Sequence, residues 1–162
     1  MRVVLNAAIV LAASLTLSVP LALASDDPCY LAYGDSKKTR ELEICAAGAK
    51  SGNADSEFQY GLILFSGANR KNDHAAGLDW IRKSARQGHR LARISLGGLL
   101  SHHEIEQSLR NVPEAYAWFT VAGAKESASK LRLQMNQREF EQAEKLVTEF
   151  RAKYGETIGI VN

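Results

Sequence analysis

Apolar residues recur at helical spacing through most of this 162-residue chain. Leu78, Ile81 and Ala85 lie three and four positions apart, while charged residues occupy positions between them. This spacing places the apolar side chains on one face of a helix. Gly88 follows, a residue suited to the left-handed conformation just past a helix end. The pattern therefore predicts a helix over residues 74–87.

The same spacing predicts further helices along the chain. Two of them cover residues 54–65 and 90–100, and a polar turn follows the first. Another opens at Pro113, a position where a missing amide hydrogen costs little. The last begins after Asn136, because Asn136 and Glu139 have the spacing of a capping box. We therefore predict an all-α chain built from helix–loop–helix units.

These units repeat along the sequence. Gly61 recurs 36 positions later as Gly97, and Trp80 recurs 38 positions later as Trp118. A backward shift of 36 from the second helix of the first unit finds half a copy at residues 41–52. Repetition at this period indicates stacked helical hairpins, which form an α-solenoid with a continuous core between neighbouring units.

The first residues have the pattern of a secretory signal peptide. Arg2 is followed by an apolar run over residues 3–19 and then by Ala22-Leu23-Ala24. A positive start, an apolar stretch and an Ala-x-Ala end predict cleavage between Ala24 and Ser25. The alternative is an uncleaved membrane anchor, although the run of about 17 residues is shorter than the roughly 20 that span a bilayer. We therefore expect a periplasmic or secreted protein without a stable membrane span after cleavage.

The expected mature chain is a single domain with nearly balanced charge. Removing Arg2 with the leader leaves 19 basic and 18 acidic residues, and no basic block is present. This balance argues against nucleic acid as a partner. We expect a signal peptide at 1–24, an N-terminal cap and partial repeat at 25–52, repeats at 53–88 and 89–125, C-terminal capping helices at 126–155 and a tail at 156–162.

Two cysteines, Cys29 and Cys45, remain in the exported chain. An even count in an oxidising compartment predicts a disulfide between them, and the alternative is a pair of free thiols. Closing a loop of about 16 residues stabilises a fold by roughly 3 kcal/mol. The bridge is expected to fasten the N-terminal segment to the first full helix.

The repeated glycines and tryptophans have expected packing roles. Gly61 and Gly97 are expected where the two helices of a hairpin cross closely, because a side chain there would hold the backbones apart. Trp80 and Trp118 are expected to fill the adjacent gap between repeats. The alternative is that the tryptophans are ligand platforms, but their recurrence within amphipathic helices favours the core.

Candidate catalytic and metal-binding groups are few. His102-His103-Glu104 is the one metal-like cluster, with His74 and His89 elsewhere in the chain. Adjacent histidines on a loop point in different directions, and no His-Glu-x-x-His spacing is present. Neither a Gly-x-Ser-x-Gly turn nor a glycine-rich phosphate loop occurs. We therefore expect no catalytic residue, no metal and no cofactor.

The repeated residues resemble those of the Sel1-like repeat, an α-solenoid relative of the tetratricopeptide repeat. The second copy lacks the loop glycine of that pattern and has Asn111 where an acidic residue is expected. The resemblance implies a short right-handed α–α solenoid of helical hairpins with a C-terminal capping helix. The pattern is matched in the first copy at Tyr60-Gly61, Gly67, Asp73, Trp80, Ser84-Ala85 and Gly88, and in the second at Leu96-Gly97, Ala115, Trp118 and Ala122. Leu64, Gly77 and Gly123 occupy further positions of the pattern but depart from its residue types.

This resemblance also implies a function. Family members often act as adaptors or regulators in the bacterial envelope, so we expect a protein partner. One alternative is a cell-wall-related or β-lactam-binding enzyme of the cysteine-rich type, whose members carry cysteine pairs within each repeat; another is a structural subunit of an envelope complex. We expect the partner to bind the variable faces of the first helices of each hairpin. The corresponding residues there are Gln59, Ile63, Ser95 and Leu99.

Overall fold

The computed structural model describes residue 29 and residues 38–67 and 73–156. The predicted signal peptide, its cleavage site at Ala24 and Ser25, and residues 157–162 of the tail lie outside this part. Every regular element in it is a helix, which confirms the all-α prediction. No helix within it has the length and apolar character needed to cross a membrane. The helices are α2 (Lys38–Lys50), α3 (Ala54–Ser66), α4 (His74–Arg86), α5 (Arg90–Ser101), α6 (Val112–Val121), α7 (Lys125–Arg132) and α8 (Gln137–Tyr154).

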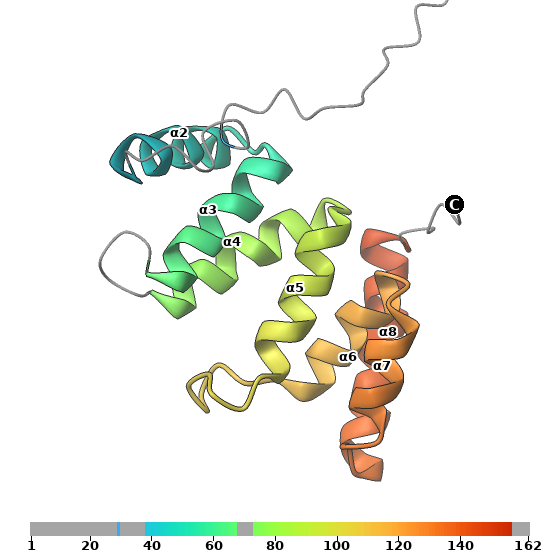
Figure 1. Ribbon diagram of the computed structural model, residues 1–162. Helices are drawn as coiled ribbons and strands as arrows, with labels where there is room; N and C mark the ends of the chain where they lie inside the picture. Colours follow the sequence, from blue (N-terminus) through green and yellow to red (C-terminus); the bar gives the residue numbers. More distant parts are fainter. Residues whose placement is uncertain (1–28, 30–37, 68–72, 157–162) are drawn as a thin grey trace, which may run out of the picture.

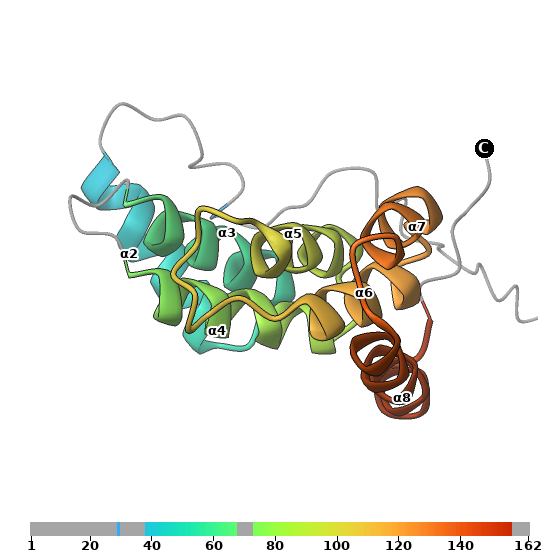
Figure 2. The same ribbon diagram turned by 90° about the horizontal axis from the view of Figure 1, so that it is seen from below.

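Consecutive helices form hairpins, and the hairpins stack along the array (Figure 1). Extensive contacts join α3 to α4, α5 to α6 and α6 to α8. Figure 2 shows two layers, with α3, α5 and α7 in one and α4 and α6 in the other. At the ends of the array, α2 packs against α3, and α8 packs against α6. The described helices thus form the short α-solenoid that the repeat predicts.

The helix ends follow local sequence signals. Asp73 caps α4 by accepting a hydrogen bond from the Ala76 amide at 3.0 Å. Gly88, just after α4, has a φ of 94°, a conformation that other residues rarely adopt. Asn136 and Glu139 form the predicted capping box at the start of α8, with both hydrogen bonds present. Short-range chemistry therefore sets where these helices begin and end.

The buried residues form two separate clusters. The main core runs through α3 to α8 and includes Trp118, which is 1% exposed. The smaller cluster lies at the N-terminal end and contains Cys29, Cys45 and Ile63. Tyr60 and Leu42 are partly buried against it. Helix α2 and one side of α3 therefore pack in a small cluster separate from the main core.

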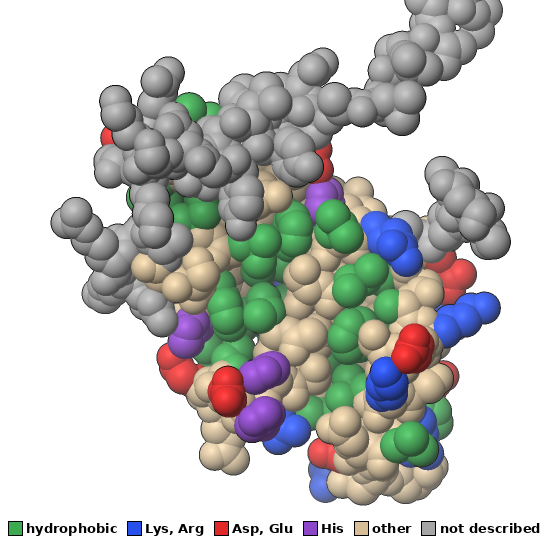
Figure 3. All heavy atoms as spheres, in the orientation of Figure 1, with side chains coloured by type: hydrophobic (Ala, Val, Ile, Leu, Met, Phe, Trp, Pro, Cys, Tyr) green, Lys and Arg blue, Asp and Glu red, His purple; other side chains and the backbone are tan. Residues whose placement is uncertain are grey.

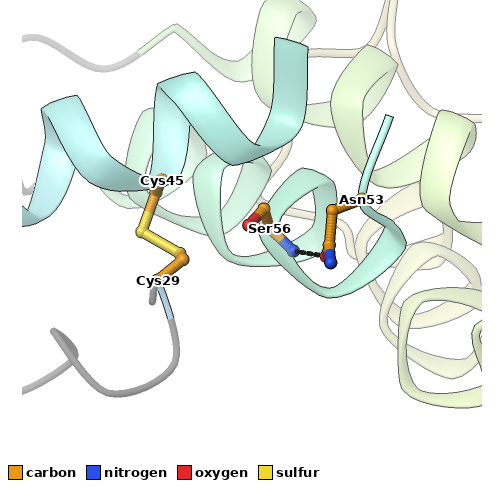
Figure 4. Close-up of a disulfide and its surroundings, with 4 residues drawn as sticks. All are labelled: Cys29, Cys45, Asn53 and Ser56. Carbon is orange, nitrogen blue, oxygen red and sulfur yellow. Dashed lines mark hydrogen bonds between the residues drawn. A yellow bond between two sulfur atoms is a disulfide. The ribbon is translucent and has the colours of Figure 1, made fainter. Parts of the chain in front are cut away.

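The predicted disulfide joins Cys29 to Cys45 of α2 (Figure 4). Their Cα atoms lie 4.6 Å apart, and both residues are fully buried. The bridge links the segment before α2 to the first full helix of the array. It also forms the centre of the smaller cluster, because Ile63 of α3 packs against it.

The crossing of α3 and α4 is built on two glycines. A β-carbon added at Gly61 would lie 2.6 Å from Ile81 Cγ1 and 2.8 Å from the Gly77 carbonyl oxygen. A β-carbon at Gly77 would lie 2.8 Å from the Gly61 carbonyl oxygen, so the close approach is reciprocal. The second unit differs, because a β-carbon at Gly97 would meet the ring of Phe119 at 2.9 Å. The space at Gly97 therefore accommodates an aromatic side chain instead of a backbone.

The two repeated tryptophans have different surroundings. Trp118 is buried against Phe150 of α8, with ring centroids 4.4 Å apart. Trp80 is only half-buried; it contacts Tyr60 edge-on at 5.5 Å, and the Lys83 ammonium lies 3.4 Å above its ring centroid. The two tryptophans, both expected to fill the gap between repeats, are therefore buried to different extents. The Trp80 ring lacks the cover that α8 gives to Trp118.

Candidate functional site: an exposed stripe on helix α5

One face of α5 is open to solvent in the described part of the chain. Leu91, Ile94, Ser95 and Gly98 occupy it at successive helical turns, and we call these four residues the α5 stripe. Leu91 is 58% exposed, and the other three are half-buried. The opposite side of the helix, which includes Leu96, is fully buried. Figure 3 shows hydrophobic side chains gathered over α3 and α5 on this face of the molecule.

Gly98 leaves open space at the C-terminal end of the α5 stripe. A β-carbon added there would meet no heavy atom within 4 Å. Glycine inside a helix costs roughly 1 kcal/mol relative to alanine, and packing among the described residues does not require it here. Its lack of a side chain lets another molecule approach the α5 backbone closely.

Polar side chains also lie on α3 and α7, the other two helices of this layer (Figure 2). Asp55 and Gln59 of α3 lie at positions equivalent to Leu91 and Ser95. On α7, Lys130 and Glu126 are exposed and form an ion pair at 2.7 Å. An apolar centre with a polar rim is the usual composition of a protein–protein interface.

Arg93 fixes α5 from its buried side. Its guanidinium is 1% exposed and donates hydrogen bonds to carbonyl oxygens at the ends of three helices. Burial lowers the pKa of this group, yet arginine stays charged at neutral pH. A cation is favourable near the negative end of a helix dipole, so one side chain stabilises three helix ends. The acceptors are Ala85 of α4 at 2.9 Å, Val121 of α6 at 3.4 Å, and Tyr154 and Gly155 at the end of α8 at 2.7 and 3.0 Å.

His89 fixes the start of α5. Its Nδ1 accepts a hydrogen bond from the Ala92 amide at 3.0 Å, which caps the helix. Its Nε2 lies 2.8 Å from an Asp55 oxygen, and its ring packs against Phe58. Because Nδ1 accepts a hydrogen bond, Nε2 carries the proton and donates a hydrogen bond to the Asp55 carboxylate. The ring therefore links the first helix of one unit to the first helix of the next.

Glu114 of α6 connects the two complete repeat units in the layer formed by α4 and α6. The guanidinium of Arg82 donates to both of its oxygens, at 2.9 and 3.2 Å. The indole nitrogen of Trp118 and the Asn111 amide donate to the same carboxylate at 3.1 and 3.2 Å. Burial lowers the pKa of Arg82, but Glu114 and Asp79 more than offset this, so the pKa is raised. The cluster holds α4 and α6 in register.

The partner-facing residues expected from sequence have mixed positions. Gln59 and Ser95 are half-buried, and Leu99 is half-buried against the main core. Ile63 is only 7% exposed and packs in the disulfide cluster, so it is not available to a partner in this structure. Its expected role needs correction because Cys29 occupies the space beside it. Leu91, which is 58% exposed, is not among the residues that the sequence indicated as partner-facing; Leu133, after α7, is exposed to 87%.

The candidate metal cluster lies on the loop between α5 and α6. His102 and His103 are exposed, and their rings stack 4.9 Å apart. The His102 Nδ1 and His103 Nε2 atoms lie 4.0 and 3.9 Å from the carboxylate oxygens of Glu104. In residue 29 and the ranges 38–67 and 73–156, no three histidine, cysteine or acidic side chains have a metal-binding arrangement. His74 lies apart from this group, 3.4 Å from Glu106.

A surface pocket of about 340 Å³ lies beside the same loop. Its walls come from the start of α6, near Pro113, and from the first turns of α8, near Gln142. Two of its polar residues have structural roles, since Asn111 caps α6 and Glu139 belongs to the capping box of α8. The pocket is open and polar, unlike the apolar stripe on α5.

Comparisons with known proteins support the fold. No family model matches the sequence, and no curated protein matches it. Among solved structures, the chain is similar to c5321, a protective antigen present in uropathogenic Escherichia coli strains that displays an SLR fold. The match has a TM-score of 0.67 and 25% sequence identity, and it covers 78% of this chain. It covers 28% of the c5321 chain, so this chain matches only part of that longer protein. The structure is an SLR-fold α-solenoid.

Proposed function

We propose that this protein is an exported interaction module that binds another protein through the α5 stripe. The observation that carries the proposal is the 58% exposure of Leu91 on α5, in the middle of the helical array of an SLR fold. An exposed leucine alone is ordinary. Here it continues into Ile94 and into the open space at Gly98. This combination fits an anchor site for a partner.

The proposed role is that of an adaptor or regulator, without catalysis. The buried and half-buried polar side chains near α5 hold the fold together: Arg93 joins helix ends, His89 caps α5 and Glu114 links two units. Each of these hydrogen bonds joins or caps helices of the array. This use of the polar residues favours binding over chemistry.

The proposed location is the periplasm or the cell exterior. The leader-like residues 1–24 support export, and the disulfide between Cys29 and Cys45 suits an oxidising compartment. A partner in the cell envelope is therefore the natural candidate.

Site-specific photo-crosslinking in the native envelope tests the proposal. A photoreactive residue at Leu91 should give a discrete adduct with a partner, whereas one at Glu149, exposed on α8, should not. Replacing Leu91 with serine should weaken capture of that partner about tenfold, the effect of losing a central anchor. Equal crosslinking from both positions, or full capture by the serine variant, would count against the α5 stripe.

A further inference from the structure

The ring of His74 contains a nitrogen that is buried without a hydrogen bond. Within residue 29 and the ranges 38–67 and 73–156, its Nδ1 is the one buried side-chain nitrogen or oxygen that lacks a hydrogen-bond partner. A carboxylate oxygen of Glu106 lies 3.4 Å away, whereas a charged hydrogen bond of this kind measures about 2.7–2.9 Å. A buried polar atom without a partner costs stability and calls for an explanation.

The groups around the His74 ring come from its own helix, from α3 and from the loop between α5 and α6. His74 is the first residue of α4, and the preceding Asp73 carboxylate accepts a hydrogen bond from the Ala76 amide. From α3, the ring of Phe65 packs against the imidazole at 4.6 Å and brings no charge. The loop contributes Glu106. The start of a helix disfavours a positive charge, but the two carboxylates favour one.

The α5–α6 loop holds Glu106 beside α4. Both Figure 1 and Figure 2 show this loop at the same edge of the array as the start of α4. The preceding residue, Ile105, is 7% exposed and packs in the main core. The Glu106 carbonyl oxygen accepts hydrogen bonds from the amides of Leu109 and Arg110 at 2.8 and 3.2 Å, which closes a turn. The backbone is therefore fixed, and the exposed carboxylate needs to shift by only about half an ångström to reach the imidazole.

His89 has the opposite arrangement. Its Nδ1 accepts a hydrogen bond from the Ala92 amide, and its Nε2 lies 2.8 Å from the Asp55 carboxylate. A proton added to Nδ1 would remove the acceptor that caps α5, because a protonated imidazole has two donors and no acceptor. The same proton added to His74 would give its unpaired nitrogen a donor beside a carboxylate.

We propose that His74 and Glu106 form a proton-controlled clasp, which closes when the imidazole is protonated and ties the α5–α6 loop to the start of α4. In the closed clasp, Nδ1 donates a charged hydrogen bond to the Glu106 carboxylate. The clasp joins the first repeat unit to the second, and the loop that it holds also lines the surface pocket through Gln107 and Arg110. Its contribution to stability is present in mild acid and is lost as the pH rises and the imidazole gives up its proton.

A double-mutant cycle at two pH values tests the clasp. The mature chain, His74→Gln, Glu106→Gln and the double variant are unfolded in urea at about pH 5.5, where imidazoles take up protons and carboxylates stay ionised, and at about pH 8. At the lower pH, Glu106→Gln should raise the unfolding equilibrium constant about threefold, the effect of a partly exposed ion pair. It should have no effect in the His74→Gln background, and none in either background at the higher pH.

Glu104→Gln is the matched control. Glu104 is exposed on the same loop, and its carboxylate lies 4.0 and 3.9 Å from His102 and His103. This substitution should have the same effect in the parent as in the His74→Gln background at both pH values. A coupling between Glu104 and His74 as large as that of Glu106 would overturn the specific pairing.

Hydrogen exchange reports on the loop itself. The Asn111 amide donates to the Leu100 carbonyl oxygen at 2.9 Å, so its exchange requires the end of the loop to open. At about pH 5.5 it should exchange about threefold more slowly in the parent than in Glu106→Gln, and equally in both at about pH 8. A Glu106→Gln effect that is equal at both pH values, or that persists in His74→Gln, would overturn the proposal. If His74→Gln does not fold, the pH dependence of Glu106→Gln decides. Partner capture does not enter this test, so the α5 stripe is judged separately.

Discussion

The two complete hairpins, α3–α4 and α5–α6, use equivalent sequence positions for different purposes. Trp118 is buried because α8 lies against it, whereas Trp80 is half-buried beneath its own neighbour Lys83. Glu57 and Arg93 are also equivalent, 36 positions apart, and both are buried, at 5% and 1% exposure. Glu57 accepts one hydrogen bond from Gln87, while Arg93 reaches three helix ends. In a short array, the neighbouring helix decides what a repeated position does.

The tryptophan pair provides the largest expected contrast. Trp118→Ala should lower the free energy of unfolding by about 3–5 kcal/mol, because it empties a site enclosed by α8. Trp80→Ala should cost only about 1 kcal/mol, since its ring is already partly exposed. Urea denaturation of the two variants measures both values. Equal losses would show that the two hairpins are buried alike, contrary to the structure.

Arg93 gives the next largest effect. Arg93→Met keeps much of the side-chain volume but removes the guanidinium donor from carbonyl oxygens at the ends of α4, α6 and α8. The expected loss is about 3 kcal/mol. Arg90→Met, at an exposed position of the same helix, should change stability by less than about 0.5 kcal/mol. If both variants unfold at the same urea concentration, the guanidinium does not hold the helix ends.

Two glycines should respond with opposite signs to the same substitution. Gly61→Ala should destabilise by about 1–3 kcal/mol, because the added carbon meets the Gly77 backbone. Gly98→Ala should stabilise by about 0.5–1 kcal/mol, since a β-carbon there has open space and alanine favours the helix. Thermal unfolding monitored by circular dichroism distinguishes them. A Gly98→Ala variant that also loses partner binding would link this glycine to the proposed site.

The smallest predicted effect concerns pH. Burial raises the pKa of Glu57, although the hydrogen bond from Gln87 and the charge of Lys83 oppose the shift. A raised folded-state pKa contributes stability below the unfolded pKa, and this contribution is lost as the pH rises through the folded pKa. Glu57→Gln should therefore be more stable than the parent at pH 7, with a difference that disappears toward about pH 4. A variant less stable than the parent at pH 7 would contradict this sign.

The sequence predicted the features that depend on nearby residues. The helix at residues 74–87 and the capping box at Asn136 were correct within one or two positions, because apolar spacing and caps act within a few residues. The disulfide followed from the cysteine count. The repeat period then gave the solenoid.

The features that depend on packing between units were not predicted. Nothing in the sequence around Trp80 says that its ring lacks a covering helix, or that Cys29 covers Ile63. Two signals were available but were not used. Arg93 is a charge on the buried face of a helix, and Gly98 is a second glycine beside Gly97, in excess of what the crossing needs. A buried charge and an extra glycine both distinguish α5 from an ordinary amphipathic helix.

The bonds of Arg93 have a mechanical consequence. The guanidinium of Arg93 on α5 binds carbonyl groups of α4, α6 and α8. A force applied to α5 is therefore distributed over these four helices. The outer side of α5 therefore behaves as a stiff platform. If Leu91 is the anchor of the proposed partner site, this rigidity would reduce the conformational entropy that α5 loses on binding.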